Sequence, residues 1–78
     1  MRKKELKLVV TFHTTADAIA LEKACQELRV PGRLIPVPRE ISAGCGLAWC
    51  APLEAQERVE SIMRENGIEQ EALHECMV

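Results

Sequence analysis

The segment Leu6-Lys7-Leu8-Val9-Val10-Thr11-Phe12, followed directly by His13-Thr14-Thr15-Ala16-Asp17, decides the fold of this chain. In its first part, large apolar side chains recur at every second position, which is typical of a strand with one buried face. In its second part, Thr14 precedes Asp17 by three positions, as in a capping box, and the acid suits the positive end of a helix dipole. The segment therefore predicts a strand over 6–12 that runs straight into a helix.

The next elements follow from the same kind of pattern. Residues 15–29 place Leu21, Cys25 and Leu28 on one helical face, and Pro31-Gly32 then stops the helix. Residues 33–37 predict a second strand. Because Pro36 lacks an amide donor, we expect this strand at an edge of the sheet.

The second half of the chain repeats this order. Residues 47–50 predict a short third strand, and Pro52 suits the first turn of a second helix that ends at Asn66-Gly67. Residues 68–78 contain the last strand. The resulting order β-α-β-β-α-β predicts one α+β domain over 1–78. Its architecture is a ferredoxin-like two-layer sandwich, with a four-stranded antiparallel sheet and two helices on one face.

Composition excludes several classes of function. The chain has 78 residues, a net charge of −2 and only 3% aromatic residues, which argues against nucleic-acid binding. Its apolar runs are too short for a membrane span or a signal peptide, so we expect a cytoplasmic location. In that compartment the four cysteines are expected to be reduced thiols.

The most unusual segment is Pro36-Val37-Pro38-Arg39-Glu40-Ile41-Ser42-Ala43-Gly44-Cys45-Gly46, which we call the cysteine loop. Two prolines keep its approach extended, and glycines on both sides of Cys45 permit a sharp turn beside the sulfur. In the predicted topology this loop returns to the sheet edge where the first helix begins. We therefore expect Cys45 to lie near His13-Thr14-Thr15.

Several groups at that edge could favour a thiolate at Cys45. They are the amides of the helix N-terminus at Thr14, the loop amides around Gly44 and Gly46, and the guanidinium of Arg39. A thiolate is the reactive form of cysteine, and a stabilised thiolate is also a good leaving group. The alternative is that Cys45 is simply a small residue in a tight hairpin.

The remaining candidates each have a simpler interpretation. His13 is a base or anion ligand beside Cys45, or only a polar cap on the strand. Cys25 is expected in the core, and Cys50 either packs beneath the second helix or begins it. No CxxC or HxxxH spacing occurs, so we predict neither a metal site nor a cofactor. Val9 and Thr11 face the open side of the sheet, where a homodimer could form.

Over nearly its whole length the chain resembles the small bacterial domains of the selenium/sulfur (Se/S) carrier protein-like family. The likeness rests on Thr11-Phe12-His13-Thr14-Thr15-Ala16-Asp17-Ala18, on Leu21-Glu22-Lys23, on Leu34 to Ser42, and on Gly44-Cys45-Gly46-Leu47-Ala48. Its most specific part is the pattern P-x-P-R-x-I-S-x-x-C-G-L-A. The Cys-Pro-x-Pro signature of other sulfur-relay carriers is absent.

The resemblance implies a carrier that holds sulfur or selenium as a persulfide or selenide on Cys45. Arg39 and Ser42 would contact the charged chalcogen. The implied partners are donor and acceptor proteins, such as a cysteine desulfurase, sulfur-relay proteins or selenium-metabolism proteins. A carrier is not a turnover enzyme, and no acid–base pair is evident. The alternative function is a non-catalytic module that binds a small ligand, a metal or a protein partner.

Overall fold

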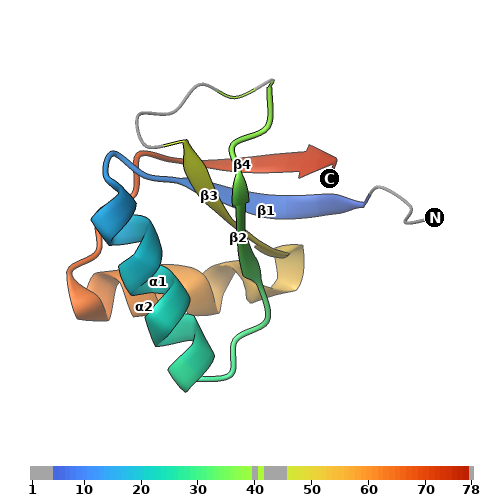
Figure 1. Ribbon diagram of the computed structural model, residues 1–78. Coiled ribbons are helices and arrows are strands. Elements are labelled where there is room, and N and C mark those ends of the chain that lie inside the picture. Colours follow the sequence, from blue (N-terminus) through green and yellow to red (C-terminus); the bar gives the residue numbers. More distant parts are fainter. Residues whose placement is uncertain (1–4, 40, 42–45, 78) are drawn as a thin grey trace.

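The computed structural model describes residues 5–39, 41 and 46–77. Its elements are β1 (Leu6–Thr11), α1 (Thr15–Glu27), β2 (Arg33–Pro36), β3 (Leu47–Pro52), the 3-10 turn η1 (Leu53–Ala55), α2 (Gln56–Asn66) and β4 (Ala72–Met77). The four strands form one antiparallel sheet in the order β2-β3-β1-β4, and both helices lie on the same side of it (Figure 1). The predicted ferredoxin-like fold is confirmed.

The core fills the space between the helices and one face of the sheet. Alternate residues of the central strands point into it, and the inner faces of α1 and α2 close it from the other side. Burial of this apolar surface is the main force that stabilises the layers. The buried members are Leu8, Val10, Phe12, Ala18, Leu21, Cys25, Val30, Trp49, Ala51, Ala55, Val59, Ile62, Met63 and Ile68.

The opposite face of the sheet is less open than the sequence pattern predicts. Val9 and Thr11, which alternate with the core residues of β1, are both 0% exposed within a single chain. On this face they lie beside Ala48 and Cys50 of β3, which are also buried. The expectation that Val9 and Thr11 offer an exposed surface to a second copy is therefore wrong.

Strand β3 is longer than predicted. It continues past Cys50 to Pro52, which pairs with Lys7 at the start of β1. Pro52 has φ −59° and ψ 146°, a conformation that suits the end of a strand, and α2 begins only at Gln56 after the turn η1. The prediction that Pro52 lies in the first turn of the second helix is therefore wrong, because the fixed φ of proline suits both positions.

Helix α1 ends without a glycine. Its last turn is closed by two bonds, from the Val30 amide to the Cys25 carbonyl (2.9 Å) and from the Arg29 amide to the Gln26 carbonyl (3.2 Å). This is the Schellman arrangement, which needs a left-handed residue, and Arg29 supplies it with φ 57°. The helix thus stops two residues before its predicted end. The predicted end of the second helix at Asn66-Gly67 is confirmed, and Gly67 takes the left-handed conformation there, with φ 64°.

The predicted position of the second strand at an edge of the sheet is confirmed. Pro36 is the last residue of β2, which is an edge strand as predicted. Along the described part of the chain, no helix combines the length and the apolar character that crossing a membrane requires.

Candidate functional site

The two ends of the cysteine loop are held together at the end of the β2–β3 hairpin. The Val37 amide donates to the Gly46 carbonyl (3.0 Å), just beyond the last strand pair, Pro36 with Leu47. The loop then begins with a turn in which the Ile41 amide donates to the Pro38 carbonyl (3.0 Å). The described ends of the loop are therefore fixed by backbone hydrogen bonds.

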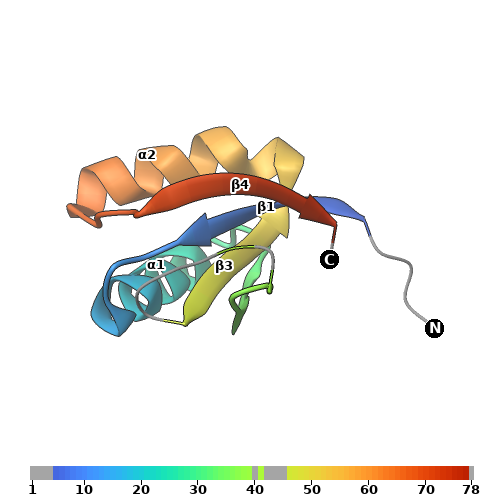
Figure 2. The ribbon, with the colours of Figure 1, turned by 90° about the horizontal axis from the view of Figure 1, so that it is seen from above.

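This hairpin end lies at the edge of the sheet where α1 starts. Thr11, the last residue of β1, pairs with Ala48 near the start of β3, and α1 begins at Thr15. Figures 1 and 2 show the start of β3, the end of β1 and the first turn of α1 at the same side of the molecule. The predicted placement of the loop ends beside the N-terminus of α1 is confirmed.

Some of the predicted site residues can be placed and others cannot. Cys45, Ser42 and Gly44 lie outside the described residues. Gly46 has φ 77° and no neighbouring atom within 4 Å of the position a Cβ would take, so its backbone angle, not crowding, favours glycine. Arg39 is exposed in the turn at the start of the loop.

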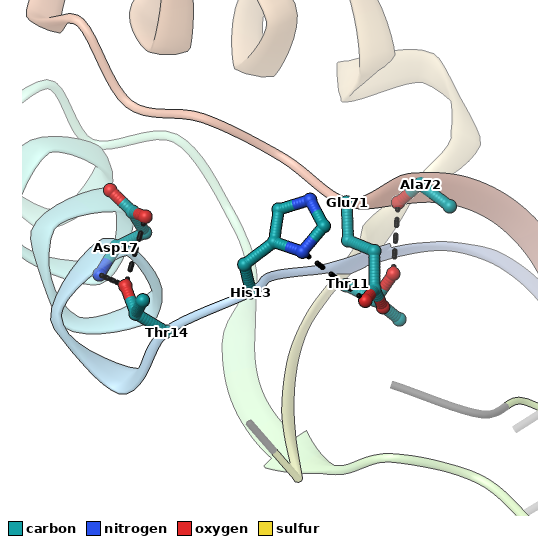
Figure 3. Close-up of polar contacts among 6 residues, drawn as sticks. All are labelled: Thr11, His13, Thr14, Asp17, Glu71 and Ala72. Atoms are coloured by element: carbon teal, nitrogen blue, oxygen red, sulfur yellow. Dashed lines mark hydrogen bonds and ion pairs between the residues drawn. The ribbon is translucent and has the colours of Figure 1, made fainter. Parts of the chain in front are cut away.

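The His13 side chain contacts a residue from the C-terminal half of the chain. Its Nδ1 lies 3.4 Å from Oε1 of Glu71, and the imidazole is 60% exposed (Figure 3). A backbone hydrogen bond fixes the position of Glu71, because its amide donates to the Thr11 carbonyl (2.7 Å). The Thr11 hydroxyl in turn lies 3.4 Å from the Ala72 carbonyl. The ring is thus anchored beside the end of β1, facing a carboxylate.

Thr14 caps α1 as the sequence predicts. Its hydroxyl accepts from the Asp17 amide (3.3 Å) and donates to the Asp17 carboxylate (2.9 Å), as Figure 3 shows. Because the Thr14 hydroxyl is occupied, the groups of this helix end that could bind an anion are the backbone amides of Thr15 and Ala16, the first two residues of the helix. The Asp17 and Glu71 carboxylates oppose any anion there. Among the described residues of the cysteine loop, Arg39 is the one cationic side chain.

The sequence pattern missed Glu71. It stands 58 positions from His13, and only the pairing of β1 with β4 brings the two together. A correct register between these strands was the one signal that could have identified it. Among the described residues, no group of three histidine, cysteine, aspartate or glutamate side chains is placed to hold a metal ion.

The other thiols have different surroundings. Cys25 is 0% exposed in the core, as predicted. Cys50 is also buried, but it lies on the sheet face away from the helices, opposite Val9 and Arg33. The prediction that it packs beneath or begins the second helix is therefore wrong. Cys76 is half-buried in β4.

Burial makes Cys25 a poor nucleophile. Desolvation raises the pKa of its thiol from 9.0 to about 11, while the nearby charge of Arg58 acts in the opposite direction. The thiolate is the reactive form, so Cys25 should remain unmodified in the folded protein at neutral pH. This thiol is structural.

The same pKa gives a testable pH dependence. In the unfolded chain the thiol ionises near 9.0 and in the folded protein near 11, so its contribution to stability is complete below pH 9.0 and is lost between these values. We expect a loss of roughly 3 kcal/mol in the free energy of unfolding across this window, relative to a Cys25→Ala variant. Urea denaturation of both proteins at several pH values measures it. Equal pH slopes would contradict the prediction.

Comparison with known proteins supports the interpretation of the sequence. No curated protein and no solved structure matches this chain. The sequence model of one family, described as "Putative Se/S carrier protein-like", matches residues 7–75, a range that begins in β1, ends in β4 and contains the whole cysteine loop. A match over most of the chain establishes membership, and the chain therefore belongs to the Se/S carrier protein-like family.

Proposed function

We propose that this protein carries sulfur or selenium as a persulfide or selenide on Cys45 and transfers it between partner proteins. The observation that supports this most is the family match, since the matched range spans the cysteine loop. The anchored loop ends give the proposal a physical basis, because Val37 and Gly46 lie at the edge where the amides of α1 begin.

The loading step is a thiol–persulfide exchange. The Cys45 thiolate attacks the terminal sulfur of a persulfide on the donor protein, and a new S–S bond forms to Cys45. The S–S bond to the donor cysteine breaks, and the donor sulfur leaves with the electron pair and takes up a proton. No oxidant or reductant is consumed. Unloading to an acceptor thiol is the same exchange in the opposite direction.

The neighbouring groups would act by stabilising negative charge on the terminal chalcogen. Arg39 is exposed at the start of the loop and can fold toward the sulfur, with Ser42 as a further donor. Gly46 would let the chain turn directly after Cys45. Because His13 already faces Glu71, we assign it a supporting role in holding the loop edge, not the role of a base.

The partners implied are a sulfur or selenium donor, such as a cysteine desulfurase, and an acceptor protein with a reactive thiol. Incubation with a cysteine desulfurase and cysteine, followed by intact-mass measurement, tests the loading step. We expect the mass of one or more sulfur atoms to be added to the wild type and removed by a reductant. Cys45→Ala should load at least about tenfold less, because the other thiols are buried or half-buried.

Matched controls separate the thiols. Cys50→Ser and Cys76→Ser should load like the wild type, and Arg39→Gln should load more slowly without loss of folding. Equal loading of Cys45→Ala and the wild type would reject the carrier thiol. In that case a non-catalytic binding module would be the better description.

A further inference from the structure

A pocket of about 270 Å³ lies at the opposite end of the sheet from the anchored ends of the cysteine loop. Lys7, Arg33 and Cys50 line it, together with Pro31 and Pro52. Strand pairing places the first three on one sheet face, the one that does not carry the core. The pocket therefore has a thiol in its wall and two cationic side chains around it.

The register of the strands fixes how these groups are arranged. Arg33 is directly opposite Cys50 in the β2–β3 pair, which corresponds to a Cβ separation of about 5 Å. Lys7 pairs with Pro52, so it is a diagonal neighbour of Cys50 across β1 and β3, at about 7 Å. The Cys50 thiol is thus placed between one cation on β2 and another on β1.

Among the described residues, neither Lys7 nor Arg33 forms an ion pair with a carboxylate. The ion pair observed there joins His13 and Glu71. Arg33 is exposed and Lys7 is half-buried, whereas Cys50 is only 5% exposed. Two unpaired positive charges beside a small, partly apolar pocket attract an anion, and the low-dielectric wall strengthens that attraction.

The pocket is separate from the cysteine loop. Cys50 follows Gly46 by four residues of extended strand, a distance of about 13 Å. The volume of the pocket is below the range typical of sites for nucleotides or drug-sized molecules, which favours a small ion with a few waters. Pro31 and Pro52, which also line the pocket, restrict the backbone beside it.

We propose that this pocket binds a small divalent oxyanion, held by Lys7 and Arg33 against the thiol of Cys50. The two cations supply the charge, and the S–H group supplies a weak donor. This inference does not depend on the proposed carrier function, because none of its residues belongs to the cysteine loop.

The direct test uses sulfate as the probe. Two-dimensional amide NMR spectra are recorded during a titration in which sulfate replaces chloride at constant ionic strength. We expect saturable shifts centred on the amides of Lys7, Arg33 and Cys50, and their loss in the Lys7→Gln/Arg33→Gln double variant. The dispersion of the same spectra reports whether the variant is folded. Shifts that are absent, or that persist in the double variant, would overturn the proposal.

A second measurement uses Cys50 itself as the reporter. Trypsin leaves Cys45 and Cys50 in one peptide, residues 40–58, so the experiment is done in a Cys45→Ser background. The alkylation rate of Cys50 by anionic iodoacetate is divided by its rate with neutral iodoacetamide. We expect this ratio to fall about 3- to 10-fold in Lys7→Gln or Arg33→Gln.

The matched control is Lys23→Gln, which removes the same charge from the exposed side of α1. It should leave the ratio unchanged. An equal fall in the control would show that overall charge, and not the pocket, selects the anion, and the proposal would then fail. Because loading on Cys45 is not measured here, failure of this test leaves the carrier proposal untouched.

Discussion

Replacement of Gly32 by alanine is expected to lower the free energy of unfolding by about 3 kcal/mol or more. A Cβ at this position would lie 2.5 Å from Cζ2 of Trp49 and 2.9 Å from the carbonyl oxygen of Cys50. The ring is 1% exposed and the carbonyl belongs to a central strand, so neither can move freely. Gly32 also has φ 150°, which L-residues rarely adopt, and each effect costs on the order of 1–3 kcal/mol.

Urea denaturation, followed by the fluorescence of Trp49, the only tryptophan, measures this loss. Gly67→Ala is the matched control, because its φ is 64° but no atom lies within 4 Å of the Cβ position. It should cost only about 1 kcal/mol. A Trp49→Leu background should recover part of the Gly32→Ala loss, since the ring contact is removed. Because this background lacks tryptophan, its unfolding is followed by far-UV circular dichroism. Equal losses for Gly32→Ala and Gly67→Ala would contradict the steric explanation.

Phe12→Ala is expected to cost about 3–5 kcal/mol, the range for truncation of a fully buried aromatic side chain. Phe12 is 0% exposed and lies in the core directly after β1. Domains of this size are typically stable by only about 5–15 kcal/mol, so a substantial unfolded fraction is expected in mild urea. Denaturation curves measure the loss.

Phe12→Leu is the matched control, because it keeps most of the apolar volume and should cost about 1–2 kcal/mol. Phe12 also precedes His13 and Thr14, so the truncation should loosen the start of α1 before the rest of the fold. Hydrogen exchange of the Asp17 amide would report this. Comparable stability of Phe12→Ala and the wild type would show that the site collapses around the gap.

The features of the fold that depend on neighbouring residues or on a repeating pattern could be predicted from the sequence. Period-two alternation located β1, the Thr14–Asp17 spacing located the first turn of α1, and Gly67 located the end of α2. Each of these signals acts over a few residues, and the order of elements then restricts the topology.

Two of the failures depend on contacts between distant segments, and one depends on an unusual local backbone conformation. The burial of Val9 on the second sheet face cannot be deduced from alternation alone. The end of α1 was misplaced because Arg29 takes the left-handed position that normally indicates glycine. Pro52 is compatible with a strand end and with a helix start, and only its pairing with Lys7 decides between them.

The same limitation applied to the site. The edge beside α1 was predicted because the topology alone determines it, and Thr14 was identified from its own cap. The contact of His13 with Glu71 and the grouping of Lys7 and Arg33 around Cys50 need the register of all four strands.

The position of β1 at the centre of the sheet has a consequence for synthesis. One of its two partners is β4, which begins 61 positions after Thr11 at Ala72, so β1 meets this neighbour only after every other element of the fold has been synthesised. At about 5–20 residues per second, the nascent strand waits several seconds with one edge uncovered. A ribosome-associated chaperone that shields apolar segments at the exit tunnel should therefore raise the yield of native protein.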